Sequence, residues 1–200
     1  GIHGPFQGVP IDSRDPLVQQ AVSTRIVQGV AVCAAIGATQ MVIHSPFTPW
    51  DYNNNPRFPN AEETVFACAH ATLAEAVRRA EDAGVTLVLE NIADKDTGAR
   101  VRLAERFASP AVRVSIDTGH AHLAHCTQGA DPVDYFVRTA GAALAHMHLQ
   151  DIDGHADRHW AIGEGTISWH GVFREIAALD TRPHLVLELS NPAGIPASMA

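Results

Sequence analysis

The sequence predicts an α/β fold, and within that class a single TIM-type (β/α) barrel domain over residues 1–200. Short apolar strands alternate with amphipathic helical segments, as expected for parallel strands that helices cover on both faces. Five strands end in side chains that bind metals or protons: His44, Glu90, Asp117, His148 and Glu188. A closed barrel brings such strand ends together at one face, whereas an open sheet spreads them along an edge. No Gly-x-Gly-x-x-Gly follows a strand, so a dinucleotide-binding sheet has no support.

The elements follow one another in a regular order. Hydrophobic spacing and capping residues predict helices over residues 16–38, 60–84, 99–107, 131–141 and 168–179. Apolar runs predict strands over residues 41–44, 86–91, 112–117, 145–149 and 184–189, after a strand tail at the start of the chain. We expect Gly37 to end the first helix, and Asn60 with Glu63 to form a capping box at the second.

Composition restricts the class of protein and its compartment. A hydrophobic content of 46% in 200 residues is enough for a real core. No run of twenty apolar residues suggests a membrane span, and no leader is recognisable, so we expect a cytoplasmic protein. Cys33, Cys68 and Cys126 are scattered along the chain, which favours free, buried thiols in a reducing compartment.

The charge balance argues against nucleic acid as a partner. The formal net charge is −8, and Lys95 is the only lysine. Nucleic-acid binders usually carry a basic surface, because neutralising phosphates supplies most of their non-specific affinity. A small molecule is therefore the expected ligand.

The strand-end carboxylates are the hardest residues to explain structurally. Glu90 and Glu188 each follow three aliphatic residues, and a carboxylate at a buried end needs a cation, a metal or a proton. Asp117 has the same problem, although Thr118 and Gly119 could form a turn around it.

The loop over residues 148–165 adds several ligand-type residues in a short stretch. It contains Asp157 and His159, which could bind metal, and His155, which a solvated loop explains equally well. We expect Glu164, between two glycines, to cap a turn, and His146 to face away from His148.

Several short motifs occur in the order typical of one family. They are His3-Gly-Pro-Phe, His44-Ser-Pro, Leu89-Glu-Asn, Asp117-Thr-Gly-His120, His148-Leu-Gln-Asp, Asp157-Arg-His159 with Gly163-Glu-Gly165, and Leu187-Glu188. With them the chain resembles the xylose-isomerase-like TIM-barrel superfamily, which includes endonuclease IV and many sugar isomerases and epimerases. The Asp-Arg-His and Gly-Glu-Gly piece is the most specific of the motifs.

The resemblance to endonuclease IV implies up to three metal ions. His3, His44 and Glu90 would hold the first ion, and Glu90 would bridge to the second. Asp117, His148 and Glu188 would complete the second site. His120, Asp157 and His159 would hold the third. All nine positions carry the expected residue type.

The resemblance also shows a departure from the family pattern. A full barrel has eight strands and about 250 residues, whereas this chain starts at what the family would count as its third strand. We therefore expect the first two strand–helix units to be missing. The exposed gap would leave room for a homo-oligomer.

Two enzyme functions follow from one set of ligands. In the favoured hypothesis, Glu90, Asp117, His148 and Glu188 hold a single divalent ion (Zn, Mn, Mg or Co). This ion serves a metal-dependent isomerase or epimerase of a small sugar, polyol or sugar phosphate, acting through an enediolate. Glu90 and Glu188 would act as base and acid, and His120 would contact a sugar hydroxyl. The alternative is a trinuclear zinc phosphodiesterase that cleaves DNA at abasic sites. A non-catalytic metal-binding barrel fragment is the third alternative.

Overall fold

The computed structural model describes residues 1–199, which form two compact units. The first unit comprises residues 1–90 and 102–113. The second comprises residues 91–101 and the chain from 114 onward. The single-domain expectation stays a prediction.

The first unit contains three parallel strands that pair in the order in which they occur in the chain: β1 (Ile2–His3), β2 (Gln40–His44) and β3 (Thr86–Glu90). In register, Met41 lies opposite Ile2 and His44 lies opposite Glu90. Parallel neighbours that follow one another in sequence need a crossover, and helices supply it here. The polar ends of the three strands therefore lie on one edge of the sheet.

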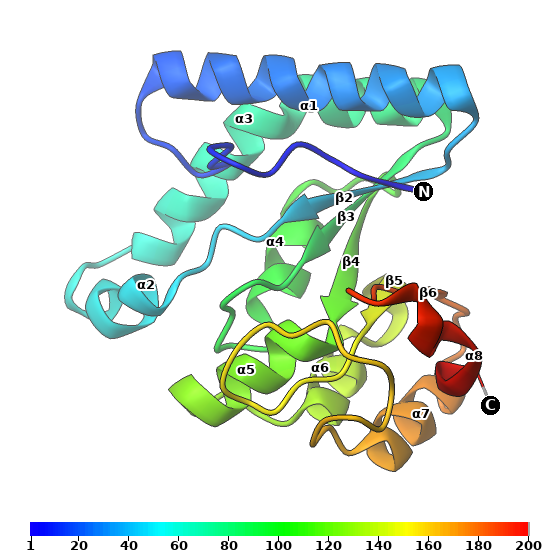
Figure 1. Cartoon of the computed structure of the whole chain (residues 1–200). Coiled ribbons are helices and arrows are strands. Elements are labelled where there is room, and N and C mark those ends of the chain that lie inside the picture. Colours follow the sequence, from blue (N-terminus) through cyan, green and yellow to red (C-terminus); the bar gives the residue numbers. More distant parts are fainter. Residues whose placement is uncertain (200) are drawn as a thin grey trace. The chain divides into compact units, whose positions relative to one another are not determined.

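Two long helices, α1 (Pro16–Ile36) and α3 (Ala61–Ala83), pack side by side over these strands (Figure 1). Buried residues on α1 are spaced by three and four positions, as expected for a helix with one face on the core. Asp15 caps its start by accepting a hydrogen bond from the Leu17 amide (2.8 Å). Gly37 ends it in the left-handed conformation (φ 72°), so the prediction for Gly37 is confirmed.

The capping box expected at Asn60 is wrong. Asn60 is the N-cap of α3, but its left-handed backbone (φ 63°) prevents the side chain from capping. A capping box forms instead between Thr48 and Asp51, at the start of α2 (Pro49–Asn54). That helix and the 3₁₀ turn η1 (Asn55–Arg57) lie between the predicted strand over residues 41–44 and the predicted helix over residues 60–84, where the sequence predicts no element.

The second unit contains a further parallel set of three strands in consecutive order: β4 (Val112–Asp117), β5 (Leu144–Leu149) and β6 (His184–Leu187). Asp117 at the end of β4 lies opposite His148 near the end of β5. The strand ends therefore meet at one edge, as in the first unit.

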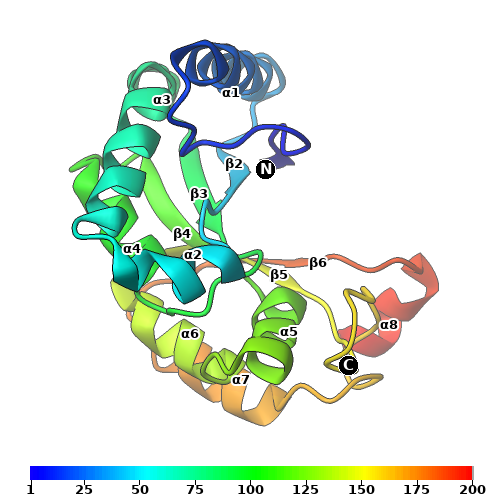
Figure 2. The same ribbon diagram turned by 90° about the vertical axis from the view of Figure 1, so that its left-hand side faces the viewer.

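The helices and turns that follow β4 in this unit are α5 (Thr118–Gln128), α6 (Val133–Ala140), η2 (Gly141–Ala143), α7 (Trp169–Ala177), η3 (Pro192–Gly194) and α8 (Ile195–Ser198). α4 (Ala99–Arg106) precedes β4, and only its first three residues belong to this unit. α6 packs against α7, with α5 beside α6 (Figure 2). The sequence does not predict α5. The N-cap of α6 is Pro132, so the helix begins at Val133, two residues after the predicted start at residue 131.

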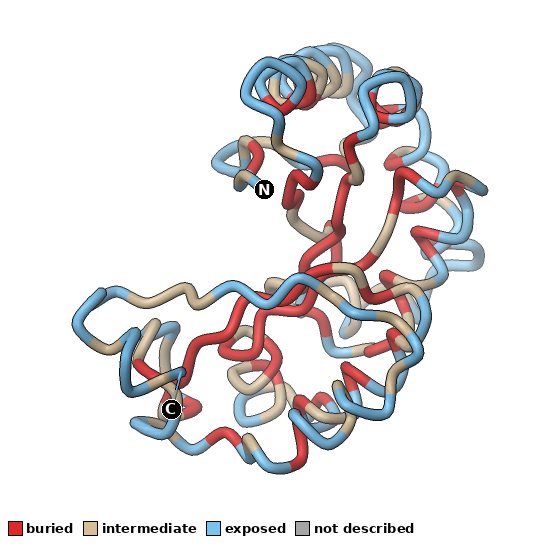
Figure 3. The backbone as a smooth tube through the Cα atoms, turned by 90° about the vertical axis from the view of Figure 1, so that its right-hand side faces the viewer, coloured by how far each residue is buried: buried red, intermediate tan, exposed pale blue. Residues whose placement is uncertain are grey.

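The strands supply much of the buried core, shown in red in Figure 3. β6 differs, because Leu185 and Val186 are 46% and 41% exposed although the sequence predicts a fully buried strand. Among the described residues of the second unit, β6 pairs with β5 alone and lies at the edge of the sheet. The Glu188 side chain is consequently 37% exposed, so the premise that its carboxylate is buried is wrong.

An ion pair inside the second unit fixes the segment after Asn91. Arg100 Nε donates to Asp94 Oδ1 at 2.8 Å, with side-chain exposures of 1% and 0%. Arg100 also donates to the carbonyl of Ser115 and lies over the ring of Phe136. Because both charges are buried, each depends on the other for compensation.

All three cysteines are free thiols, as expected, but only Cys33 is buried, because Cys68 is half-buried and Cys126 is exposed. No helix within residues 1–199 combines the length and the apolar character needed to cross a membrane.

Candidate metal centre

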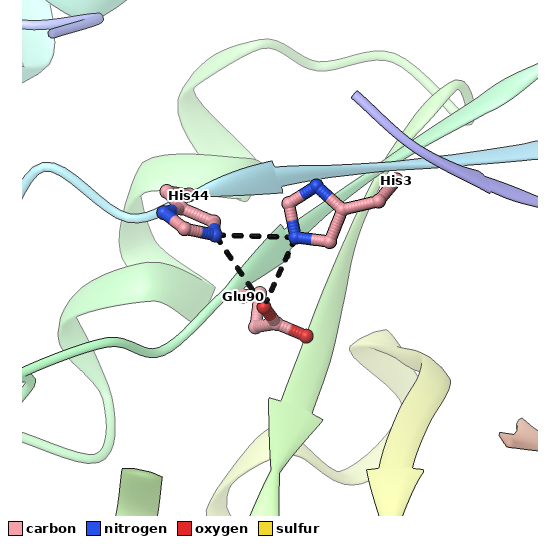
Figure 4. Close-up of side chains that lie close together, drawn as sticks. All are labelled: His3, His44 and Glu90. Atoms are coloured by element: carbon pink, nitrogen blue, oxygen red, sulfur yellow. Dashed lines mark hydrogen bonds and ion pairs between the residues drawn. The ribbon is translucent and has the colours of Figure 1, made fainter. Parts of the chain in front are cut away.

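The three strand ends of the first unit bring His3, His44 and Glu90 together (Figure 4). His3 Nε2 lies 3.2 Å from His44 Nε2. Glu90 Oε2 lies 3.9 Å from His3 Nε2 and 3.8 Å from His44 Nε2. The Glu90 side chain is only 2% exposed, so its carboxylate needs a cationic partner.

These three side chains fit a divalent metal ion. His3 Nδ1 lies 2.9 Å from the Gly4 carbonyl, to which it donates, so the lone pair of Nε2 faces His44 and Glu90. A tetrahedral ion with bonds of about 2.0–2.1 Å separates its ligand atoms by roughly 3.3 Å. The observed separations of 3.2–3.9 Å need only a small adjustment.

Phe6 packs against both histidine rings of this cluster. Its ring centroid lies 4.9 Å from that of His3 and 5.0 Å from that of His44. The two imidazoles therefore have a fixed orientation before any ion binds.

The second unit contains a separate cluster of His120, Asp157 and His159. Asp157 Oδ2 lies 3.3 Å from His120 Nε2 and 3.1 Å from His159 Nε2. Each histidine uses its other nitrogen elsewhere. His120 Nδ1 donates to the Asn91 carbonyl (3.0 Å), and His159 Nδ1 donates to the Glu188 carbonyl (2.9 Å). Both Nε2 atoms therefore face the same carboxylate, as in a metal site with its outer hydrogen bonds in place.

The electrostatics of this cluster are those of a site that holds positive charge. A hydrogen bond with Asp157 raises the pKa of His159 to about 9, although burial opposes the shift. Burial raises the pKa of Asp157, but hydrogen bonds from His120, His159 and Gln150 outweigh it and hold the pKa well below its usual range. Asp157 is therefore ionised at neutral pH, and a divalent cation can replace the proton of His159.

The backbone at His159 supports the same interpretation. His159 has a positive φ of 52°, which is uncommon for a residue other than glycine. Its amide donates to Gln150 Oε1 at 2.8 Å, which holds the strained residue in place. Strained backbone of this kind concentrates at functional sites.

Asp117, His148 and Glu188 lie at the strand ends of the second unit. Asp117 is opposite His148 in the β4–β5 register. His148 Nδ1 lies 2.9 Å from Glu188 Oε2. Asp117 is also the N-cap of α5, because its Oδ1 accepts a hydrogen bond from the His120 amide (2.7 Å). One carboxylate therefore caps a helix and lies beside His148.

Two positioning residues, Gln150 and Asn91, are missed by the sequence reasoning. Gln150 is fully buried, and its Nε2 lies 3.1 Å from Asp117 Oδ1 and 2.9 Å from Asp157 Oδ1. It packs on Gly119, where an added Cβ would lie 2.5 Å from Gln150 Cδ. Asn91 accepts from the Asp117 amide (2.9 Å) and donates to the Asp117 carbonyl (3.0 Å).

Asp151 organises the loop over residues 148–165. Its carboxylate accepts hydrogen bonds from the amides of Ile152, Gly163 and Ile167 and from Trp169 Nε1. Glu164 Oε2 accepts from the Ala161 amide at 3.0 Å, which confirms that Glu164 caps a turn. The loop is thereby fixed around Asp157 and His159.

The sequence prediction for His146 is wrong. The rings of His146 and His148 lie 4.9 Å apart, because residues two apart in a strand point to the same face. The sequence leaves two roles open for His155, a metal ligand or a solvated loop residue. The structure favours the second, because His155 is exposed and lies outside the ligand clusters of the described residues.

Comparison with known proteins identifies a family match over the whole chain. The model of the xylose isomerase-like TIM barrel family matches residues 1–200. An uncharacterized protein of Mycobacterium leprae is 29% identical over 187 residues, covering 83% of this chain and 61% of the relative. The chain spans about three fifths of the length of the curated relatives it matches (59% and 61%).

Solved structures show the same fold. A D-tagatose 3-epimerase-like protein matches with a TM-score of 0.81 and 22% identity, over 99% of this chain and 73% of its own. The TTHB071 protein of Thermus thermophilus, soaked with ZnCl₂, matches with a TM-score of 0.70 and 27% identity, over 98% and 73%. The predicted barrel-type α/β class is confirmed. The residues described contain six strands rather than the eight of a full barrel, as predicted.

Proposed function

Because the chain belongs to the xylose isomerase-like TIM barrel family, we propose that it is a divalent-metal-dependent isomerase or epimerase of a small sugar, polyol or sugar phosphate. The observation that carries the proposal is the contact of His148 Nδ1 with Glu188 Oε2 (2.9 Å), beside Asp117 at the same strand edge. Asp117, His148 and Glu188 can together hold one ion, and the exposed Glu188 carboxylate can also contact a substrate. The name of the D-tagatose 3-epimerase-like structure supports the same substrate class.

The proposed mechanism moves a proton on the carbon next to a substrate carbonyl. Glu188, 37% exposed, can reach a substrate and take or return that proton. His120 Nδ1 is held by the Asn91 carbonyl, so Nε2 can contact a substrate hydroxyl when no ion occupies the cluster with Asp157 and His159. When bound, a Zn, Mn, Mg or Co ion supplies Lewis-acid stabilisation of the enediolate. The resemblance makes Glu90 the second proton carrier and the ligand shared by two ions, and both assignments stay predictions.

Solvent exchange tests this function directly. The full chain, stripped with EDTA and reloaded with each of the four ions in turn, is incubated with D-tagatose, D-fructose and their phosphate esters in D₂O. We expect metal-dependent deuterium incorporation beside the carbonyl, followed by NMR, and its loss in Glu188→Gln. No exchange with any ion or ketose in the panel would refute the proposal.

A second candidate is a trinuclear phosphodiesterase acting at abasic sites in DNA. The observation that favours it is the cluster of His120, Asp157 and His159, because a mononuclear isomerase has no need for Asp157 and His159. The net charge of −8 argues against it, since no basic surface is evident in the composition.

Metal content and one nuclease assay separate the two candidates. About three Zn ions per chain, together with cleavage of an abasic-site oligonucleotide, would favour the phosphodiesterase. One ion per chain with exchange into a ketose would favour the isomerase. His159→Ala should abolish cleavage under the first mechanism and spare exchange under the second.

A further inference from the structure

A cleft of about 510 Å³ lies in the first unit, apart from the residues of the His3 cluster. Its walls come from the loop after β1, which carries Asp12 and Arg14, and from α2, which carries Trp50 and Asp51. η1, the segment after it and the first turn of α3 complete the lining. β1 and β2 end at His3 and His44, so the cleft is built from the loops at the same edge of the sheet as the metal ligands. Its volume lies within the roughly 300–1,000 Å³ of small-molecule sites.

Two large aromatic side chains line this cleft without being buried. Trp50 is 63% exposed and Phe58 is 59% exposed. Exposed aromatic surface gathered in a concave site marks a binding surface more often than a packing defect. The faces of the two rings can stack on the C–H faces of a sugar.

The polar groups of the cleft are positioned before a ligand arrives. Asp51 Oδ2 accepts from the Thr48 amide (3.0 Å) and the Thr48 hydroxyl (2.6 Å), so its carboxylate is held in place. Asn55 Nδ2 lies 3.4 Å from Asp51 Oδ1. Burial raises the pKa of Asp12, and the charge of Asp51 raises it further, against the effects of its own backbone hydrogen bond and of Arg14. Ligand hydroxyls that donate hydrogen bonds to Asp12 would stabilise its ionised carboxylate, which burial disfavours.

The charges of the cleft select against anions. Asp12 and Asp51 outnumber Arg14 among its charged residues, and the chain as a whole carries −8. A phosphate group placed here would face two carboxylates. A neutral polyhydroxyl compound would meet acceptors, a guanidinium donor and two aromatic faces.

We propose that this cleft binds a neutral glycosyl or polyol group, so that the substrate is an unphosphorylated sugar that extends beyond the reacting carbons. This inference rests on the proposed function for the choice of a sugar. It goes further in naming Trp50 and Phe58 as the residues that determine specificity, and in excluding sugar phosphates from the cleft.

Calorimetric titration of the EDTA-treated full chain tests the cleft independently of catalysis. The probes are cellobiose, maltose and lactose as neutral disaccharides, with glucose 6-phosphate as the anionic comparison. We expect saturable binding of at least one disaccharide, at least tenfold weaker in Trp50→Ala and in Phe58→Ala. Trp50→Phe should retain most of the affinity. Phe173→Ala, which removes a 40% exposed ring on α7, is the matched control and should bind like the native chain.

Each outcome bears on the inference. No saturation by any disaccharide, equal affinity in Trp50→Ala, or tighter binding of glucose 6-phosphate would overturn it. If disaccharides bind through Trp50 but no ketose incorporates deuterium, the binding role of the cleft is supported and the proposed isomerase activity is refuted. If a ketose incorporates deuterium while Trp50→Ala leaves disaccharide binding and the KM unchanged, the isomerase activity is supported and the binding role of the cleft is refuted.

Discussion

Replacing Gln150 with leucine should weaken metal binding in the second unit without touching a ligand. Gln150 Nε2 lies 3.1 Å and 3.3 Å from the two oxygens of Asp117 and 2.9 Å from Asp157 Oδ1. Its Oε1 accepts from the His159 amide. Leucine has a similar volume but leaves two carboxylates without their shared donor and one amide without its acceptor.

The expected magnitude follows from these contacts. Hydrogen bonds to charged groups contribute about 1.5–3 kcal/mol each, but a bound ion replaces part of what the carboxylates lose. Loss of such an outer partner typically lowers metal affinity by about 10–100-fold, which is about 1.4–2.8 kcal/mol. The metal-free protein should also lose about 1–3 kcal/mol, because the His159 amide is left unsatisfied. For a chain of this length that corresponds to a fall in Tm of roughly 2–12 °C.

Zinc titration against a chromogenic chelator at pH 7.5 gives the affinity, and circular dichroism of the EDTA-treated protein gives the Tm. Gln28→Leu on the exposed side of α1 is the matched control, and it should change neither quantity. Zinc affinity within twofold of the native value in Gln150→Leu would refute the positioning role. A lowered Tm with unchanged zinc affinity would show that Gln150 stabilises the fold but does not position the metal ligands.

Three further predictions follow from other contacts. Arg100→Met should destabilise the second unit by about 3–5 kcal/mol in urea unfolding, because it leaves the carboxylate of Asp94 buried without its partner. If the chain binds more than one ion, His159→Ala should reduce bound Zn by one ion per chain in elemental analysis. Glu188→Gln should abolish ketose exchange with the fold unchanged. Gly165→Ala should destabilise the loop by at least 2 kcal/mol in thermal unfolding, because the new Cβ would overlap the Ile152 carbonyl and the Asp151 carboxylate.

Matched variants make these predictions falsifiable. The double change Arg100→Met with Asp94→Leu should recover part of the stability, since it removes both buried charges. Gly8→Ala, at φ +67° with open space around the Cβ, should cost only about 1–2 kcal/mol. Equal losses for Gly8→Ala and Gly165→Ala would show that the overlap at Asp151 does not matter. Full Zn content in His159→Ala would contradict its assignment as a ligand.

The strand ends were predictable because two local signals coincide there. An aliphatic run marks a buried strand, and a ligand-type residue directly after it has no apolar reason to be present. That logic identified Glu90, Asp117 and His148, all of which are buried in the structure. It failed for the burial of Glu188, because an aliphatic run cannot distinguish an edge strand from a central one.

The positioning residues were not predictable from local patterns. Gln150 follows the strand like any polar loop residue, and its role depends on Asp117 and Asp157 from other segments. The helix α5 was also missed, because five of its residues are histidine or threonine, which have modest helix propensity. The start of α5 is instead fixed by Asp117, whose carboxylate caps the helix. The pairing of β4 with β5 also places Asp117 beside His148.

The tautomers of the histidines bear on the number of metal ions more directly than the ligand types do. His3, His120 and His159 each donate Nδ1–H to a backbone carbonyl, and each presents Nε2 to a carboxylate. A histidine kept only for structure gains nothing from this arrangement, because a neutral Nε2 beside an ionised carboxylate lacks a proton to share. At His159, whose pKa the hydrogen bond with Asp157 raises to about 9, a proton or a metal ion is therefore favoured between Nε2 and the carboxylate. Both clusters therefore favour bound cations, and the isomerase hypothesis must accommodate ions beyond the one that its chemistry requires.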